Sequence, residues 1–480
     1  MRVRLIPYNG KMLAFVLFAL LLVSCSEDKL YYGSDRPLEF SADTISFDTI
    51  FTAKGSAVRA LTVYNPYKNP MVIEHISHTN PVFKLNIDGQ SSESVRNLRI
   101  EARDSVRIMV QTYIDPTDDT HPIREMDELE FLCNGMRQQV VLMAFGRNVK
   151  RMRGRELSSD TLVTSDVPIL VQDSLVVSAG TQLRLGAGAV LYFEKKASLI
   201  VYGSLVAEGS ADAPVLLRGD RSDYMNTSPP LSYDQSSSQW VGVCFRSGAT
   251  NNLLDNVILR NPTIGISIEP SDMSETVLAI RNSQIYNASG DLIQASKAKV
   301  LLENSLFYNA GGYLLNMAGG ECDAYFCTFA NYYQFSWGGR TSASIRQANY
   351  YFDRTGQPVS QSLEINLMNS IVYGSWTMEL SRDEWGQAPL NYNYYNCLLK
   401  VKASAVDAHF HQCYYNEDPA FQCMVWDAAL HPFEFDFHLT SSSSAIGRAK
   451  QSIATIYPVD LDGKARTTDG SADIGCYEYY

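Results

Sequence analysis

The sequence predicts an all-β protein whose larger part is a parallel β-helix, and three observations lead to this fold class. The hexapeptides Asn282–Asn287 and Asn304–Asn309 lie 22 residues apart, and Asn331 follows Asn309 by the same step. A fixed period in the twenties is typical of a solenoid. Within each copy the apolar residues alternate, which predicts short strands that stack coil upon coil. The region before the repeat alternates strands and turns differently, which indicates a separate module.

The chain begins with a segment typical of secretion. Arg2, Arg4 and Lys11 precede the apolar run Met12–Val23. This run is shorter than the ~20 apolar residues that span a bilayer. The sequence therefore predicts a signal peptide over residues 1–24.

Leu22–Cys25 resembles the lipobox of bacterial lipoproteins, in which the cysteine thiol is joined to diacylglycerol. The resemblance implies lipidation of Cys25 and a lipidated tether over residues 25–36. Ser26–Asp28 resembles the export signal of surface lipoproteins in Bacteroidota. We therefore expect an outer membrane lipoprotein that is exposed at the cell surface and contacts the membrane through its lipid anchor. A periplasmic orientation is the alternative.

Charge narrows the class of partner. The 40 Lys and Arg residues against 52 Asp and Glu residues give a net charge of −12. This balance argues against nucleic acid, because phosphate binding needs a concentrated cationic face. The 28 Tyr and 20 Phe residues fit either half-buried strand positions or sugar-facing platforms.

Nine cysteines minus Cys25 leave eight, which in an oxidising compartment could form four disulfides. Cys322 with Cys327 and Cys413 with Cys423 are close enough in sequence to pair. A solenoid interior stacks like residues, however, and a free thiol behaves as a small apolar group. We favour interior thiols and leave any pairing open.

Residues 37–146 are predicted to form a small β-sandwich. Turn dipeptides such as Asn134-Gly135 fall between the strands. Leu38–Ser41, Phe83–Gly89 and Ala144–Gly146 resemble immunoglobulin-like modules that precede β-helices in such lipoproteins. The resemblance implies a spacer. The expected strands are Ile45–Phe51, Leu61–Tyr64, Val72–Ile76, Phe83–Ile87, Val106–Val110, Leu129–Cys133 and Val140–Phe145.

Residues 147–155 contain five basic side chains around Gly154, and a charge run between domains predicts a solvated linker. Beyond it, short apolar segments such as Leu199–Gly203 are joined by Gly turns, as at the corners of coils. Asparagine suits such corners because it tolerates the left-handed conformation and can bond to the neighbouring coil. The corner residues expected from the sequence are Asn256, Asn282, Asn304 and Asn369.

Two segments carry a resemblance to known β-helices. Gly203–Gly209 with Trp240–Phe245 resembles the opening rungs of right-handed parallel β-helices of the pectin-lyase-like superfamily. Pro458–Arg466 with Asp473–Glu478 resembles the terminal rung of its choice-of-anchor branch. These resemblances imply a right-handed β-helix over residues 156–480 with a C-terminal capping rung. They also imply polysaccharide lyases and glycosidases among the relatives.

Within that tail, Asp460 and Asp462 lack the continuing spacing of a calcium loop, so we interpret them as turn caps. On a strand, His409, His411 and Cys413 would share one face. A fourth ligand and its supporting residues are not evident. We predict neither a metal nor a cofactor.

Catalysis would need more than the sequence offers. A hydrolase needs two carboxylates about 5 to 9 Å apart, and the adjacent Asp383 and Glu384 would point to opposite faces of a strand. A lyase needs a base and a cation that neutralises the substrate acid. The residues that could line such a cleft are Arg382, Lys400, Lys402 and His409. No calcium-binding cluster of aspartates accompanies them in the sequence.

Recognition is expected where the repeat is interrupted, between Asn331 and Asn369 and between Trp376 and Asn391. Long loops on a rigid solenoid commonly carry binding residues. Aromatic rings there would stack on sugars or, alternatively, pin the loops to the wall. The candidate glycan-binding residues are Trp337, Arg340, Tyr350, Tyr351, Trp376, Arg382, Asp383 and Trp385.

The resulting expectation is a lipid-anchored surface protein whose β-helix binds an extracellular polysaccharide without turnover. A polysaccharide lyase or glycoside hydrolase is the first alternative. A structural or adhesive protein that binds another protein is the second.

Overall fold

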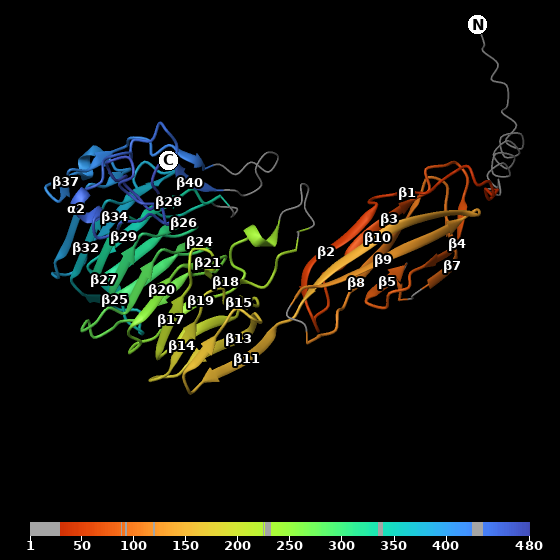
Figure 1. Ribbon diagram of the computed structural model, residues 1–480, viewed down its shortest axis with the longest axis horizontal. Helices are drawn as coiled ribbons and strands as arrows, with labels where there is room; N and C mark the ends of the chain where they lie inside the picture. The colour runs from red at the N-terminus through yellow and green to blue at the C-terminus, as the bar shows by residue number, and fades with distance from the viewer. Residues whose placement is uncertain are drawn as a thin grey trace, which may run out of the picture. The chain divides into compact units, whose positions relative to one another are not determined.

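The computed structural model describes residues 29–87, 89–91, 94–118, 121–223, 225, 232–334, 339–424 and 435–480. Cys25 and the leader lie outside this part. The chain divides into two compact units, one ending at Arg147 and the other beginning at Asn148 (Figure 1). Nearly all regular structure is β, which confirms the all-β class. No helix in the described residues is long and apolar enough to cross a membrane.

The N-terminal unit consists of two five-stranded sheets, with strand orders β1-β3-β8-β5-β6 and β2-β10-β9-β4-β7. Side chains from both sheets form one apolar core, including Phe47, Phe83 and Phe131. The immunoglobulin-like topology stays a prediction. The strands are β1 (Glu39–Phe40), β2 (Thr44–Phe51), β3 (Arg59–Tyr64), β4 (Met71–Ser77), β5 (Phe83–Ile87), β6 (Gln90–Ser91), β7 (Ser94–Ile100), β8 (Ser105–Thr112), β9 (Ile123–Cys133) and β10 (Met136–Arg147).

The C-terminal unit contains a 26-stranded parallel sheet that runs from β11 to β38, and the predicted β-helix is confirmed. Figure 1 shows its coils stacked from yellow β11 to blue β37. The lower half comprises β11 (Lys150–Leu157), β12 (Thr161–Val163), β13 (Ile169–Val177), β14 (Gln182–Leu185), β15 (Val190–Phe193), β16 (Ser198–Val201), β17 (Ser204–Glu208), β18 (Val215–Gly219), β19 (Gly242–Phe245), β20 (Asn252–Asp255), β21 (Val257–Arg260), β22 (Ile266–Ile268) and β23 (Leu278–Arg281).

The upper half continues the same stacking and carries an insertion between β29 and β32. Its ladder strands are β24 (Gln284–Ala288), β25 (Ile293–Glu303), β26 (Leu306–Ala310), β27 (Leu315–Tyr325), β28 (Thr328–Asn331), β29 (Ile345–Ala348), β32 (Leu363–Met368), β33 (Ile371–Gly374), β34 (Leu380–Asp383), β35 (Leu390–Tyr395), β36 (Leu398–Leu399), β37 (Phe410–His411) and β38 (Tyr414–Tyr415). The insertion contains β30 (Tyr350–Phe352) and β31 (Pro358–Ser360). The ladder is followed by β39 (Phe421–Cys423), which pairs with β40 (Asp436–Leu439), and by the helix α2 (Gln451–Ala454).

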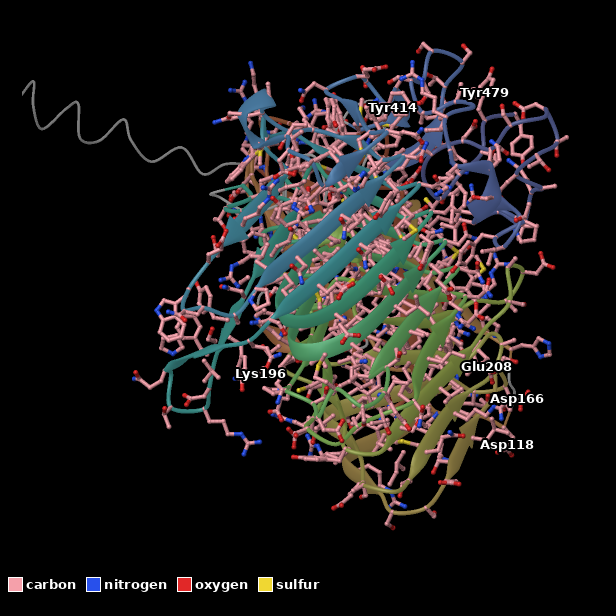
Figure 2. All side chains as sticks on the ribbon, turned by 90° about the vertical axis from the view of Figure 1, so that its left-hand side faces the viewer. Asp118, Asp166, Lys196, Glu208, Tyr414 and Tyr479 are labelled. Carbon is pink, nitrogen blue, oxygen red and sulfur yellow. The ribbon has the colours of Figure 1, made fainter. Side chains whose placement is uncertain are left out.

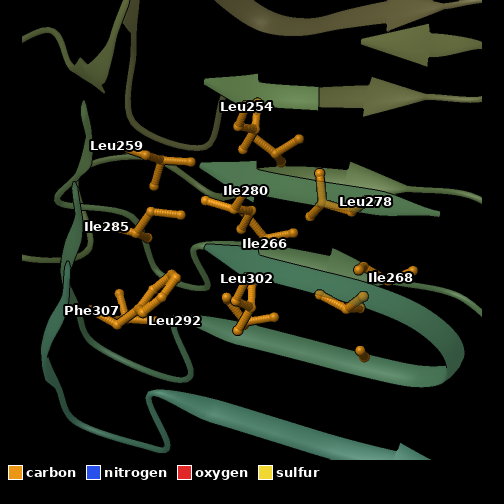
Figure 3. Close-up of a cluster of buried hydrophobic side chains, with 14 of the residues drawn as sticks. Leu254, Leu259, Ile266, Ile268, Leu278, Ile280, Ile285, Leu292, Leu302 and Phe307 are labelled. Carbon is orange, nitrogen blue, oxygen red and sulfur yellow. The ribbon is translucent and has the colours of Figure 1, made fainter. Parts of the chain in front are cut away.

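The core of the β-helix is a set of stacked apolar columns (Figure 3). Leu254, Ile280 and Leu302 are register partners in successive coils, and all are fully buried. Alternation along each strand directs every second side chain inward. Parallel pairing then places like residues above one another. Each such burial contributes about 1.5–3 kcal/mol.

The asparagine corners form as predicted. Asn256, Asn282, Asn304 and Asn369 have positive φ angles between 47° and 52°. Asn304 Nδ2 donates to Asn282 Oδ1 at 2.8 Å, so the side chains link successive coils. In one coil the corner residue is Phe326, also with positive φ (51°).

The eight cysteines of the described chain are free thiols, and Cys322, Cys327 and Cys397 are buried. Cys327 and Cys397 each follow a left-handed corner residue, the position that serines hold in neighbouring coils. This arrangement is the interior thiol role that we favoured.

Two predicted boundaries need correction. The prediction of a basic linker over 147–155 is wrong, because Lys150–Leu157 forms β11 and pairs in parallel with β13. The basic side chains of this first strand face outward, where solvent accommodates their charge, while the backbone joins the ladder.

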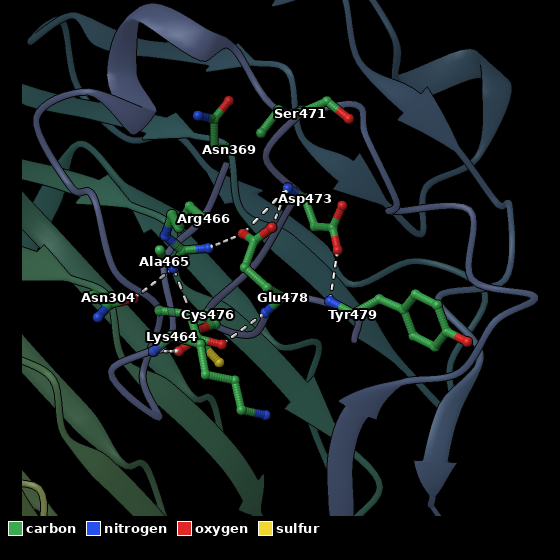
Figure 4. A network of polar contacts seen from close by, with 12 residues as sticks. Asn304, Asn369, Lys464, Ala465, Arg466, Ser471, Asp473, Cys476, Glu478 and Tyr479 are labelled. Carbon is green, nitrogen blue, oxygen red and sulfur yellow. Dashed lines mark hydrogen bonds and ion pairs between the residues drawn. The ribbon is translucent and has the colours of Figure 1, made fainter. Parts of the chain in front are cut away.

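The C-terminal capping rung is also not observed. The ladder ends at β38, and residues 435–480, which we call the C-terminal strap, return along its side (Figure 4). Ile474 and Cys476 of the strap pack with Leu306 and Ile371, which belong to two coils separated by the coil of Thr328. The motif is therefore a lateral cover and not an added coil. Asp460 is the predicted turn cap, since its Oδ1 accepts from the amides of Asp462 and Lys464.

Candidate functional site

The first interruption of the repeat forms a β-hairpin with exposed aromatic rings. Tyr350 contacts Phe352 edge-on, with centroids 5.6 Å apart, and its centroid lies 6.2 Å from that of Trp385. Phe352 is 60% exposed and Trp385 is 45% exposed. We call these three side chains the aromatic platform. The β30–β31 hairpin is the teal loop that projects at the left of Figure 2.

Hydrogen bonds hold the two loops of the platform together. Asn349 is 2% exposed. Its Oδ1 accepts from the Trp385 amide at 2.7 Å, and its Nδ2 donates to the Ala388 carbonyl at 2.6 Å. Ser360 Oγ accepts from the Ala388 amide at 3.2 Å. The rings are therefore positioned before any ligand arrives, which lowers the entropic cost of binding.

An ion pair supports the platform from below. Arg346 Nε donates to Asp383 Oδ2 at 2.6 Å, and its Nη2 donates to the Tyr350 hydroxyl at 3.1 Å. Asn316 Oδ1 accepts from Arg346 Nη1. Asp383, a predicted site residue, thus fixes Tyr350 through Arg346.

Arg340 does not belong to this surface. It is 7% exposed, and its guanidinium pairs with the fully buried Glu379 and donates to the carbonyls of Asn331 and Ser342. Trp376 is 40% exposed, and its ring centroid lies 5.1 Å from the Arg340 guanidinium carbon. Arg340 therefore fixes its loop to the wall and offers no exposed group for a glycan.

Arg382 closes the upper end of the solenoid. Its Nη1 donates to the Tyr392 hydroxyl at 2.6 Å and to Asp407 Oδ2 at 3.2 Å. Tyr392 extends the inward column of Ile365 in the coil below. These polar groups cover the open end of the core, so Arg382 has a structural role.

The same cluster lacks the properties of a lyase base. Burial and the hydrogen bond to Asp407 raise the pKa of Tyr392 above its ordinary value. Partial burial raises the pKa of Asp407, but hydrogen bonds from Tyr392 and the His409 amide outweigh it and lower the pKa overall. A tyrosine base needs a lowered pKa.

The remaining candidates are dispersed. Tyr351 is half-buried on β30, and Trp337 lies outside the described residues. Lys400 Nζ donates to the Gly374 carbonyl at 2.7 Å, while Lys402 is exposed near the turn η2 (Ala403–Ala405). The described residues contain no cluster of three metal-ligating side chains.

His409, His411 and Cys413 do not share one strand face as predicted, because the strand is interrupted at Gln412. This residue adopts a positive φ of 52°, which ends the strand alternation. His409 and His411 are exposed, whereas Cys413 contacts the Tyr394 carbonyl.

Sequence reasoning missed an acidic face on β27 and β32. Glu321 pairs in register with Glu364, and Asp323 lies two residues further along the same outward face. Lys299 Nζ lies 3.0 Å from Glu321 Oε2, and Asn366 Nδ2 donates to Asp323 at 2.9 Å. The sequence signal for this face is the alternation of the acidic Glu321 and Asp323 with the inward Cys322.

Comparison with known proteins gives no family assignment: no family model matches and no curated protein matches. Among solved structures, a PapD-like domain of human CEP192 matches 26% of this chain and 97% of its own length, at 10% identity and a TM-score of 0.17. The catalytic unit of a GH87 alpha-1,3-glucanase from Streptomyces thermodiastaticus matches 74% of this chain and 86% of its own, at 8% identity and a TM-score of 0.22. The E. coli chaperone DraB matches 25% of this chain and 59% of its own, at 12% identity and a TM-score of 0.17.

Proposed function

We propose that this protein is a lipid-anchored cell-surface protein that binds an extracellular polysaccharide through the aromatic platform, without turnover. The observation that carries the proposal is the set of exposed rings held by buried polar contacts. Exposed rings of this kind offer flat apolar faces with polar groups beside them, the combination that sugar rings require.

The charge around the platform favours a neutral sugar polymer. Arg346 is already paired with Asp383, and Arg354 at the hairpin turn lies 3.6 Å from the Glu269 carboxylate, so each of these cations already has an acidic partner. The net charge of the chain is −12, which repels polyanions in general. Hydroxyl groups of a neutral chain can instead bond to Asp383 and to the loop backbone.

The direct test is a glycan array followed by calorimetry with the best neutral hit. Trp385→Ala and Phe352→Ala should each weaken binding by about 0.5–1.5 kcal/mol, the usual value of an aromatic contact. Tyr113→Ala is a matched control, because Tyr113 is 44% exposed in the N-terminal sandwich. Unchanged affinity in both platform variants would contradict the proposal.

A glycoside hydrolase is the second candidate, and the acidic face favours it. Register partners in adjacent coils lie about 4.8 Å apart, and carboxylate pairs at about 5–9 Å perform glycoside hydrolysis. Incubating the bound glycan with protein and measuring reducing ends tests this function. If Glu321→Gln or Glu364→Gln abolishes a release of reducing ends by the wild-type protein, hydrolysis replaces binding as the function.

The anchor is tested separately. Cys25→Ala should move the protein from the detergent phase to the aqueous phase in Triton partitioning. Protease added to intact cells should degrade the wild-type protein if it faces outward. Membrane retention of the variant would contradict lipidation, and full protection from protease would place the protein in the periplasm.

A further inference from the structure

One column of turns forms a continuous edge of the β-helix. Each of these turns leaves the column of strands that begins with the second half of β13 and continues through β16, β19, β22, β25, β27, β29 and β34. The aromatic hairpin is the turn that follows β29. The turn after β34 carries Trp385. Whatever lies on the turns of the lower coils therefore shares an edge with the platform.

The lower part of this edge contains a polar groove of about 480 Å³. Three successive turns contribute Gly180, Gly203 and Gly248 to it. A Cβ at Gly203 would lie 2.1 Å from the Thr181 carbonyl oxygen, so glycine is required for the close turn. Gly180 and Gly248 have positive φ and open space around the missing side chain. The groove exists because these three glycine turns carry no side chains that would fill the space beside the backbone.

The groove has the composition of a sugar-binding surface. Tyr202 lines it and is 44% exposed. Asp160, Gln182, Ser204 and Asn251 supply carboxylate, amide and hydroxyl groups along the same wall. The described lining residues include no Lys or Arg. An aromatic ring among neutral and acidic hydrogen-bonding groups suits a neutral sugar and disfavours a uronate.

Ion pairs connect the groove to the hairpin. Arg354, at the hairpin turn, lies 3.6 Å from Glu269 Oε2. Arg246 pairs with the same carboxylate at 2.6 Å, and the amide of Ser247, a groove residue, donates to it at 3.1 Å. The hairpin therefore leans along the edge toward the groove.

We propose that the groove around Tyr202 is a second subsite for the same ligand, and that one extended neutral polysaccharide chain lies along the turn edge and contacts both regions. This inference rests on the proposed function of the platform. Five strand pairings separate β16, which precedes Tyr202, from β29, which precedes Tyr350. At the spacing of neighbouring strands this is about 24 Å. A short oligosaccharide reaches one subsite and a longer chain reaches both.

The test measures affinity against chain length. Size-graded oligosaccharides prepared from the neutral array hit are titrated into the full-length protein. Because the second contact becomes intramolecular, affinity should rise with length until the chain spans both regions and then level off. Two variants remove the lower subsite. Tyr202→Ala removes the ring, and Gly180→Asn fills the groove with a residue that tolerates its left-handed conformation.

Both variants should weaken binding of spanning chains by about 3- to 10-fold and leave short oligosaccharides unaffected. Gly463→Asn is the matched control, since Gly463 also has positive φ and open space but lies in the C-terminal strap. Affinity that is independent of length, or an equal loss for all lengths in Tyr202→Ala, would overturn the second subsite while leaving the platform intact. Absence of binding to every oligosaccharide would overturn the platform and the second subsite together.

Discussion

The aromatic hairpin of β30 and β31 and the C-terminal strap have similar compositions, but they differ in how far their side chains are buried. Both are irregular excursions from one ladder, and both combine aromatic rings with Arg and acidic residues. In the strap, Arg466 is fully buried, and Asp460, Asp473 and Glu478 are each at most 5% exposed. In the hairpin, Phe352 and Trp385 remain exposed. Composition alone does not distinguish a segment that keeps its rings exposed from one that covers the core.

The difference lies in where the polar groups find partners. Arg466 Nη1 pairs with Glu478 at 2.5 Å, and its Nη2 donates to Asn304 Oδ1 at 2.6 Å. Its guanidinium carbon lies 4.0 Å from the centroid of Phe326, the residue that replaces asparagine in the corner ladder. The strap thus contacts the column of asparagine corners at the coil where Phe326 interrupts it. The hairpin bonds mainly to its own neighbouring loop and leaves its ring faces to solvent.

The largest effect is expected from Arg466→Met. The change removes the cation that pairs with the buried Glu478, and breaking a buried ion pair from one side costs about 3–5 kcal/mol. Urea unfolding followed by far-UV circular dichroism measures the loss in the C-terminal unit. Glycan binding at the platform should survive under conditions where the variant is folded. A loss below about 1 kcal/mol would mean that the strap is not integral to the β-helix.

The pH dependence of stability probes the same network. Burial, together with the nearby Asp473, raises the pKa of Glu478 to about 8, although Arg466 opposes the shift. A raised pKa in the folded state means that the folded protein binds the proton more tightly than the unfolded chain. This contribution is complete below the unfolded pKa near 4.5 and is lost as pH rises through about 8.

The free energy of unfolding should therefore be lower at pH 9 than at pH 6, by at least about 1.4 kcal/mol, the value of one pKa unit. Glu478→Gln should flatten the profile over this range. Burial also raises the pKa of Asp473, so a residual slope in the same direction is expected. A wild-type profile that rises from pH 6 to pH 9 would contradict the assignment.

A smaller effect is expected from Asn349→Ala, which tests whether the platform depends on its support. The variant removes two hydrogen bonds between the hairpin and the Trp385 loop, each worth about 0.5–1.5 kcal/mol. Glycan affinity should fall although no ring has been removed. Gln357→Ala, at the exposed hairpin turn, is the control and should leave affinity unchanged. Equal affinity in both variants would show that the rings need no fixed positions.

Local rules explain what the sequence could predict. The asparagine corners follow from the conformational preference of a single residue type, and the apolar columns follow from alternation. Arg340 and Arg382 were misjudged because their partners, Glu379 and Asp407, lie 39 and 25 residues away. No local pattern specifies such pairs. The strap was mistaken for a coil because its motif resembles a terminal rung, whereas its packing against distant coils is tertiary.

The missed parts of the site have the same origin. Phe352 and Arg346 stood inside the excursion, but exposure and pairing depend on how the hairpin folds back on the ladder. Trp385 and Tyr350 were among the predicted residues because aromatic side chains in a long loop are typical of binding surfaces. The sequence did not reveal the groove because, apart from Tyr202, its lining consists mostly of glycines and polar residues from three separate turns that only the stacking of the coils brings together.

The smallest effect is expected from Arg354→Ala, the counterpart of Arg466→Met. Both arginines pair with a glutamate, but the side chain of Arg354 is 88% exposed and its nitrogen lies 3.6 Å from the Glu269 carboxylate, which already has Arg246. Exposed pairs contribute about 0–1 kcal/mol and are screened by salt. We therefore expect a change in unfolding free energy below about 0.5 kcal/mol, and less still in 1 M salt. A salt-independent loss comparable to that of Arg466→Met would show that the hairpin is a structural cover like the strap. That result would remove the distinction on which the binding surface is argued, because a hairpin that the ladder needs for stability would account for its own rings and polar contacts.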